Sequence, residues 1–211
     1  MRIGFVVDGR AEYESLADVL LKVDTRHTLV TRILRADLQP SAPLGQIALE
    51  ASKRIRDLVV SRQVQRAVVL IDREQNPSCC GEYARDLAAA ITKQCQGKGL
   101  GVEIQVVVKD RMYENWLVAD PVAFDQLSAR FDPSTIQKGV GRHGADGDKA
   151  LALLKRAAVK KQFDKVPDAA RITQHLDPLR MGEHSRSFRK LLGVVGCSAY
   201  TAQTKRPASQ I

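Results

Sequence analysis

Four acidic residues stand at places in the sequence where a folded sheet would bring them together. Asp8 and Glu12 follow one short run of apolar residues, and Asp72 and Glu74 follow a second such run. Runs of this kind, rich in Val and Ile and ending in loop residues, predict central strands of a parallel sheet, whose carboxyl ends meet at one edge. Like charges repel each other at such an edge, so four carboxylates there call for a cation, most simply Mg²⁺ or Mn²⁺ bound by oxygen ligands.

The spacing within each acidic pair agrees with this chemistry. Asp8 and Glu12 are four residues apart across a turn that enters a helix, and Gly9 permits a tight backbone there. Asp72 and Glu74 are two residues apart at a strand end, where alternate residues share a face. The alternative interpretation is that the first pair only begins a helix, favoured by the helix dipole, and that the second pair is a solvated turn.

Strands and helices alternate in the part of the chain that must position these residues. Because strand-helix-strand crossovers place helices on both faces, the alternation predicts an α/β fold with a parallel sheet of about four strands flanked by helices. Beyond the fourth strand the pattern becomes helical, so we divide the chain into an α/β core with the acidic metal site, residues 1–120, and a mostly helical basic appendage packed on it, residues 121–211. Strands are predicted over 3–7, 28–34, 68–71 and 102–108, and helices over about 13–22, 47–61, 81–94, 112–119, 121–130, 149–159, 167–175 and 187–192.

The positive charge of the chain is concentrated in its second part. Residues 138–211 contain 15 Lys and Arg against 6 Asp and Glu, whereas residues 1–137 contain 18 of each kind. A positive region beside an acidic metal cluster suits a polyanionic substrate such as nucleic acid, and the alternative is a basic face that is merely solvated. The candidate phosphate contacts are Lys165, Arg186, Arg189 and Lys190.

The sequence also argues against several other classes of protein. No apolar run approaches the roughly 20 residues that span a bilayer, and the first residues lack the pattern of a signal peptide, so we expect a cytoplasmic protein that does not bind membranes. The four Cys residues lack the paired spacing of a zinc site. The glycine-rich segment 97–101 lacks the Lys-Ser/Thr ending of a phosphate loop, which predicts that the chain has no nucleotide-triphosphate site of its own.

Two residues just after the fourth predicted strand are candidates for different roles. Glu114, on a short helix, could reach the acidic edge and complete the shell of metal ligands. Trp116 is the only tryptophan, and the apolar residues around it predict a core anchor, with a platform for base stacking as the alternative.

Several segments of the chain, taken together, resemble a known family. The pattern acid-Gly-x-x-Glu after a strand, at residues 8–12, and the pattern acid-x-acid after a later strand, at 72–74, resemble the Toprim domain. Three later segments make the chain look more narrowly like the Toprim-like family catalogued as domain of unknown function 4276. They are a Glu-x-Trp-Leu-x-Ala-Asp helix at 113–120, an aromatic-x-Lys element at 162–165 and a Ser-Phe-Arg-x-Leu-Leu ending at 185–192, so the likeness spans nearly the whole chain.

The resemblance implies a site and an activity. By that resemblance, Asp72 and Glu74 would ligate a divalent metal, Asp8 would manage a proton or a second metal, and Glu12 would be a further ligand. Toprim proteins usually carry Glu where this chain has Asp8 and Asp where it has Glu74, so two carboxylates differ in length by one methylene. The implied activity is that of a small nuclease, related to Toprim nucleases of the overcoming-lysogenization-defect type, which cleaves phosphodiester bonds and partners an ATPase in phage defence.

Two other functions stay open at this point. A catalytically inactive Toprim-like scaffold would bind nucleic acid or an ATPase partner, and the changed lengths of Asp8 and Glu74 favour it. A Mg²⁺-dependent phosphohydrolase acting on a small phosphate ester would also use acids at parallel strand ends, but it would need a closed pocket instead of an open basic groove. The oligomeric state is left open, with a homodimer as one option.

Overall fold

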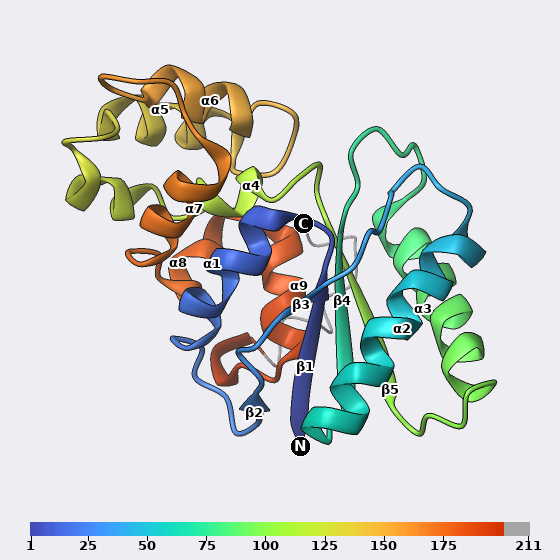
Figure 1. The fold of residues 1–211 in the computed structure, drawn as a ribbon. Helices are drawn as coiled ribbons and strands as arrows, with labels where there is room; N and C mark the ends of the chain where they lie inside the picture. The colour runs from blue at the N-terminus through green and yellow to red at the C-terminus, as the bar shows by residue number, and fades with distance from the viewer. Residues whose placement is uncertain (201–211) are drawn as a thin grey trace.

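A parallel sheet forms the centre of the molecule (Figure 1). A computed structural model describes residues 1–200, apart from the side chains of residues 142 and 143. In the sheet, Val7 lies opposite Leu70, and Asp72 lies opposite Lys109, so the carboxyl ends of three strands are adjacent. The strand order is β2 (Thr28–Leu29), β1 (Arg2–Val7), β4 (Arg66–Asp72), β5 (Glu103–Lys109), and β3 (Leu34–Arg35) also pairs with β1.

The central strands are found as predicted from the sequence, whereas the side strands next to β1 differ from the prediction. The strands predicted over 3–7, 68–71 and 102–108 are found as β1, β4 and β5. The strand predicted over 28–34 is instead two short strands, β2 and β3, which both pair with β1. A tight turn, in which the Ile33 amide donates to the Thr31 carbonyl at 3.0 Å, interrupts the strand between them.

Helices cover both faces of the sheet, as predicted for this α/β class (Figure 1). Helices α2 (Leu44–Arg62) and α3 (Cys80–Gln96) pack on each other over one face, and α1 (Arg10–Leu20) lies on the opposite face. Each buried strand serves two cores because its side chains alternate between the faces. Along β4, Val68 and Leu70 belong to the core on the α1 side, and Val69 and Ile71 belong to the core under α2 and α3.

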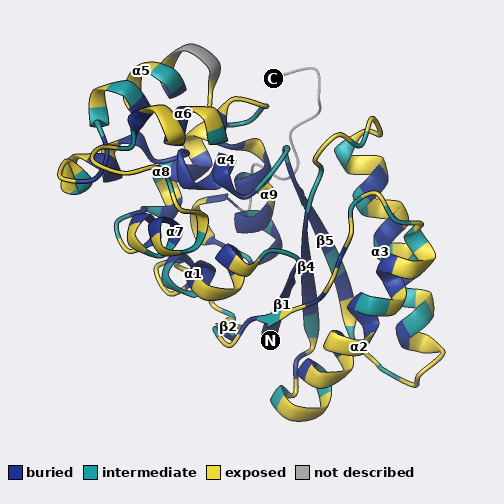
Figure 2. Cartoon of the chain, turned by 45° about the horizontal axis from the view of Figure 1, so that its top comes forward, coloured by how far each residue is buried: buried dark blue, intermediate teal, exposed yellow. Residues whose placement is uncertain are grey.

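The chain beyond β5 is a helical region that packs on the α1 side of the sheet (Figure 2). Helix α7 contacts α1, and α9 contacts β5. The two helices predicted over 112–119 and 121–130 are only a single helical turn and a 3₁₀ segment, and the last eleven residues of the predicted appendage lie outside the described residues. The elements are α4 (Glu114–Leu117), η1 (Pro121–Leu127), α5 (Pro133–His143), α6 (Ala150–Ala157), α7 (Lys165–Thr173), α8 (Pro178–His184), α9 (Arg186–Val194) and η2 (Ser198–Tyr200).

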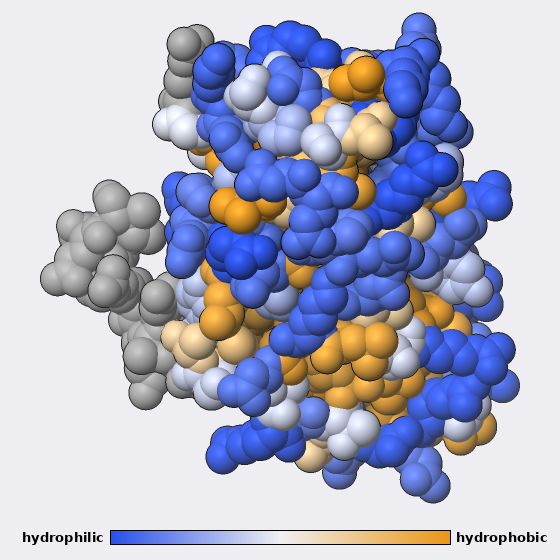
Figure 3. All heavy atoms as spheres, turned by 90° about the vertical axis from the view of Figure 1, so that its left-hand side faces the viewer, coloured by the Kyte–Doolittle hydropathy of each residue, from blue (hydrophilic) through white to orange (hydrophobic). Residues whose placement is uncertain are grey.

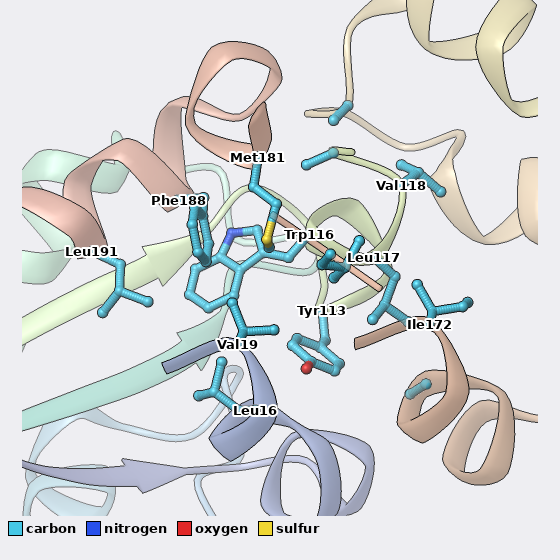
Figure 4. Close-up of a cluster of buried hydrophobic side chains, with 14 of the residues drawn as sticks. Leu16, Val19, Tyr113, Trp116, Leu117, Val118, Ile172, Met181, Phe188 and Leu191 are labelled. Carbon is cyan, nitrogen blue, oxygen red and sulfur yellow. The ribbon is translucent and has the colours of Figure 1, made fainter. Parts of the chain in front are cut away.

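Trp116 anchors the core of this helical region. Its side chain is fully buried, and its ring meets Phe188 edge to face with centroids 5.1 Å apart (Figure 4). The indole Nε1 donates a hydrogen bond of 2.8 Å to Ser187 Oγ, which satisfies the polar atom of a buried indole. Trp116 is therefore a core residue, as the sequence analysis favoured, and its ring is not available for base stacking.

The outer surface of the helical region is mainly hydrophilic. Figure 3 shows the side of the molecule that carries α1, α7 and α8, where polar side chains surround separate apolar areas. Among residues 1–200, no helix combines the length and the apolar character that crossing a membrane would require.

Candidate functional site

Three of the predicted acidic residues converge on the ammonium group of one lysine. Lys109, the last residue of β5, places its Nζ 2.9 Å from Asp8 Oδ1 and 3.0 Å from Asp72 Oδ1. The same nitrogen also donates a hydrogen bond to Glu12 Oε1. Lys109 is fully buried, and the carboxyl-bearing side chains of Asp8, Glu12 and Asp72 are 11%, 1% and 17% exposed. We call Asp8, Glu12, Asp72 and Lys109 the lysine-carboxylate cluster.

The backbone of the sheet edge holds these side chains in place. Asp8 follows β1, and its Oδ2 accepts a hydrogen bond of 3.1 Å from the Asp72 amide at the end of β4. Glu12 stands in the first turn of α1 and accepts a hydrogen bond of 3.0 Å from the Gly9 amide. A Cβ on residue 9 would lie only 2.6 Å from Glu12 Oε2, so a larger residue there would have to displace the Glu12 carboxylate.

Burial and charge shift the pKa values of the cluster in different directions. Burial raises the pKa of Glu12 well above its usual range, and the nearby charges of Asp8 and Asp72 raise it further against the opposing effect of the ammonium. Burial likewise raises the pKa of Asp72 to about 6. For Asp8, burial would also raise the pKa, but the Lys109 charge and several hydrogen bonds outweigh it and lower that pKa.

Lys109 remains charged because its partners outweigh its burial. Burial alone would lower the pKa of a lysine, but the three carboxylates raise the pKa of Lys109 well above its ordinary value. The ammonium makes hydrogen bonds to Asp8 and Glu12, whereas Asp72 Oδ1 lies 3.0 Å from Nζ outside hydrogen-bond geometry and accepts no hydrogen bond from the described residues. Coulomb attraction still acts at that distance, so we treat the contact with Asp72 as an ion pair.

A fourth carboxylate, Glu114, lies close to this cluster. Its side chain is 1% exposed, and its charge contributes to the raised pKa of Asp72. Lys165 Nζ lies 2.9 Å from Glu114 Oε1, and the Lys165 side chain is 56% exposed. Glu114 Oε2 is buried and has no hydrogen-bond partner within the described residues. Such an unsatisfied carboxylate oxygen is costly in a folded protein, and a cation would relieve that cost.

Glu74 is not brought to the cluster, contrary to the geometry expected from the sequence. Its φ of 49° is left-handed, so the rule that alternate strand residues share a face does not apply beyond Asp72. The Glu74 amide donates to the Arg111 carbonyl at 2.8 Å, and Arg111 Nη1 donates to the Glu74 carbonyl at 2.8 Å. The exposed Glu74 side chain lines a separate cavity of about 950 Å³ with residues of the loops after β3 and β4.

The candidate phosphate contacts differ in how far they are free to bind a ligand. Arg189 Nη1 donates to the carbonyls of Gly182 and Glu183, so this guanidinium closes the end of α8. Lys165 is paired with Glu114 but exposed, and the side chains of Arg186 and Lys190 are exposed and make no ion pair with the described part of the chain. Lys165 is thus the candidate that lies next to Glu114 and the lysine-carboxylate cluster.

Four basic residues beside the site were not singled out from the sequence. Lys109 is one of them, and its only sequence signal is that it directly ends the apolar run 106–108, as the acids end the runs of β1 and β4. The other three line a cavity of about 560 Å³, whose wall also includes Asp146 and Asp148. None of these three basic residues forms an ion pair within residues 1–200. They are Lys138, Lys149 and Arg156.

Asn115 connects this cavity to the acidic edge. Asn115 Nδ2 donates to the carbonyls of Ala145 and Gly147 at 2.7 and 2.8 Å. Asn115 is next to Glu114 in α4. The same helical turn therefore positions the Glu114 carboxylate and the backbone at Ala145 and Gly147 that lines the cavity.

Carboxylate oxygens are donors of the type that divalent cations prefer, but at this sheet edge a lysine ammonium lies between three of the carboxylates. No group of three or more His, Cys, Asp or Glu side chains among residues 1–200 is arranged as a ready metal site, and Lys109 lies among the carboxylates. Glu114 Oε2, which lacks a hydrogen-bond partner within the described residues, is a hard donor of the kind that Mg²⁺ and Mn²⁺ prefer, whereas Asp72 Oδ1 is paired with the Lys109 ammonium. The residues that would hold such an ion belong to this edge and do not include Glu74.

Comparison with known proteins gives one match. The model of the family described as "Domain of unknown function (DUF4276)" matches residues 7–195. No curated protein and no solved structure matches the chain.

Proposed function

We propose that this chain, which belongs to the DUF4276 family, cleaves phosphodiester bonds of nucleic acid with the help of a divalent cation bound at the edge formed by Asp8, Glu12, Asp72 and Glu114. The observation that carries the proposal is the buried Glu114 Oε2, which has no hydrogen-bond partner among residues 1–200 and whose carboxylate acts on the pKa of Asp72. Buried acidic groups that lack hydrogen bonds and lie at the carboxyl end of a parallel sheet are typical of functional sites.

The side chains of the edge would divide the chemical work. A bound Mg²⁺ or Mn²⁺ supplies Lewis acidity, because it withdraws charge from a phosphate and lowers the pKa of water. Glu12, with its raised pKa, is the carboxyl group best suited to hold a proton near neutral pH. The lowered pKa of Asp8 keeps that carboxylate ionised. Lys165 is exposed beside Glu114 and would bind a phosphate oxygen of the substrate.

Free basic groups beyond the edge support a polyanionic substrate. Lys138, Lys149 and Arg156 line the cavity next to α4, and no carboxylate in the described residues pairs with them. A nucleic acid presents phosphates on both sides of the one that is cleaved, so cations at a distance from the acidic edge would hold the flanking phosphates.

The Toprim likeness extends the proposal to a biological setting. It rests on the segments 8–12 and 72–74, and it supports a nuclease subunit that works with an ATPase partner in phage defence. A small chain without a phosphate-loop motif of its own would obtain the energy of ATP hydrolysis from such a partner.

The experiment is a cleavage assay with matched acidic variants. Purified protein is incubated with plasmid, single-stranded DNA and RNA, each with Mg²⁺, Mn²⁺ or EDTA. We expect cleavage that requires the metal, a loss of more than a hundredfold in Asp72→Asn, and less than a threefold change in the control Glu14→Gln, whose exposed side chain pairs with Arg10 on α1. Cleavage that persists in EDTA, or in the Asp72 variant, would contradict the proposal.

One observation favours a second function, a binding module without catalysis. The Lys109 ammonium already neutralises the centre of the acidic edge, which a purely structural cluster would also require. This alternative predicts nucleic-acid binding that is independent of metal and no cleavage, even when a candidate ATPase is added. A gel-shift measurement in EDTA, run beside the cleavage assay, separates the two functions.

A further inference from the structure

The cavity of about 560 Å³ is enclosed by α5, the loop that follows it and α6, and we call it the basic cavity. We infer that the basic cavity holds backbone phosphates of a nucleic-acid strand without a metal ion and without reading the bases. The inference deepens the proposed function and rests on it for the identity of the ligand, because that function supplies a nucleic-acid substrate.

Three basic side chains reach the cavity from separate parts of its wall. Lys138 belongs to α5, Lys149 directly precedes α6, and Arg156 stands in the last turn of α6. All three residues are exposed, and within residues 1–200 none of their side chains makes an ion pair or a hydrogen bond. They can therefore bind phosphate oxygens without giving up a partner in the described part of the chain.

The packing of α5 on α6 brings these cations to one cavity. The two helices are in contact, and a Cβ on Gly139 would lie 2.5 Å from Leu153 Cδ1, so a larger residue there would push the helices apart. The loop between the helices is fixed by Asn115, whose Nδ2 donates to the carbonyls of Ala145 and Gly147. The cavity is thus formed before any ligand binds, which lowers the entropic cost of binding.

The charge of the lining separates the basic cavity from the larger cavity beside Glu74. Three cations and two carboxylates line the basic cavity, a net charge of +1. One of these carboxylates, Asp146, is already occupied, since its oxygens accept from Ser185 Oγ and from the Arg186 amide at 2.7 Å. Two arginines and four carboxylates line the cavity of about 950 Å³, a net charge of −2. A phosphate is therefore attracted to the basic cavity and repelled by the larger one.

The remaining lining residues offer little for recognising a base. Apart from the charged residues, they are only Gly, Ala, Val and Leu, and no aromatic, amide or hydroxyl side chain is among the described residues of the wall. Stacking of bases on protein uses aromatic rings, and adenine is read by Asn or Gln. Contacts to phosphates position a strand but carry no sequence information. Binding through this cavity should therefore be nearly independent of sequence.

Helix α4 joins the basic cavity to the acidic edge. Glu114 is the first residue of α4, and Val118, directly after its last residue, lines the cavity. A helix rises by 1.5 Å per residue, so about 6 Å of helix axis separate the two. A strand with one phosphate at the acidic edge would therefore reach the basic cavity with a nearby phosphate.

The test measures how salt weakens the binding of fluorescent single-stranded 20-mers to the full chain in EDTA, by anisotropy. The probes are oligo-dT, oligo-dA and a mixed sequence that contains guanine. We expect Arg156→Gln and Lys149→Gln each to reduce the slope of log affinity against log salt by about 0.7, and to weaken binding by about threefold or more, equally for all probes. The control is Lys155→Gln, which removes the same charge from an exposed neighbour of Arg156 that does not line the cavity. It should leave the slope within about 0.2 of wild type.

The outcomes separate this inference from the proposed function. Cavity variants that behave like Lys155→Gln, or that weaken one probe much more than another, would overturn the inference and leave metal-dependent cleavage standing. Wild-type protein that binds no probe in EDTA would overturn it as well. The expected slopes without cleavage in Mg²⁺ or Mn²⁺ would support the basic cavity and overturn the nuclease function. Thermal unfolding of each variant confirms that the exposed substitutions leave the fold intact.

Discussion

A large effect on stability is expected from replacing Lys109 with methionine. Methionine keeps much of the length and the apolar stem of the side chain, so packing changes little and the main loss is the ammonium. That loss leaves three carboxylates facing one another, with Asp8, Glu12 and Asp72 between 1% and 17% exposed. Removing one partner from a buried ion pair typically costs about 3–5 kcal/mol, and we expect a cost in this range at pH 7.5.

The pH dependence of this cost identifies its electrostatic origin. Without the ammonium, the folded variant can relieve the repulsion only by protonating its carboxylates, so its pKa values rise above those of the unfolded chain. A folded state that binds more protons than the unfolded state gains stability as pH falls. We therefore expect the difference between wild type and Lys109→Met to shrink by about half or more between pH 7.5 and pH 5.

Urea unfolding followed by circular dichroism gives both quantities. The free energy of unfolding is measured at pH 7.5 and pH 5 for wild type, Lys109→Met and the control Lys53→Met, in the absence of divalent ions. The control should change the free energy by less than about 0.5 kcal/mol because it affects an exposed pair. A loss below about 1 kcal/mol in Lys109→Met, or a loss equal at both pH values, would show that the Lys109 charge does not stabilise the cluster.

Three further predictions concern single residues. Gly9→Ala should cost about 1–3 kcal/mol in urea unfolding because the new Cβ would lie 2.6 Å from Glu12 Oε2, and an unchanged stability would show that Glu12 moves freely. At a metal concentration below saturation, the cleavage rate should rise as pH increases through about 6, the pKa of Asp72 in the metal-free protein, because only the ionised carboxylate binds the ion, and a rate that falls over this range would contradict that role. Trp116→Ala should cost about 3–5 kcal/mol, and a smaller loss in thermal or urea unfolding would contradict its role as the anchor of the helical region.

The central sheet could be predicted from the sequence because its strands are continuous apolar runs. Strands β1 and β4 are buried on both faces, and such strands carry the strongest local signal. The short strands β2 and β3 could not be predicted in detail. Each is two residues long, and its extended conformation is stabilised by pairing with β1 and not by a local sequence pattern. The helices after β5 were placed roughly, since short charged segments have weak periodicity and depend on tertiary contacts.

The site was predicted in part, and the differences have identifiable physical reasons. Asp8, Glu12 and Asp72 converge because adjacent parallel strands bring their carboxyl ends together. Glu74 does not join them, because a left-handed residue ends the strand geometry from which its position was predicted. Lys109 was missed because a lysine after an apolar run resembles an ordinary solvated strand end, and only the register of β5 with β4 places it opposite Asp72.

The most direct test of a divalent-cation site at this edge is an anomalous diffraction measurement on crystals soaked in Mn²⁺. We expect an anomalous peak at the edge formed by Asp8, Glu12, Asp72 and Glu114, about 2 Å from carboxylate oxygens that include Asp72. A peak bound to Glu74 instead, or no peak near Asp72 at a Mn²⁺ concentration that supports cleavage, would contradict it.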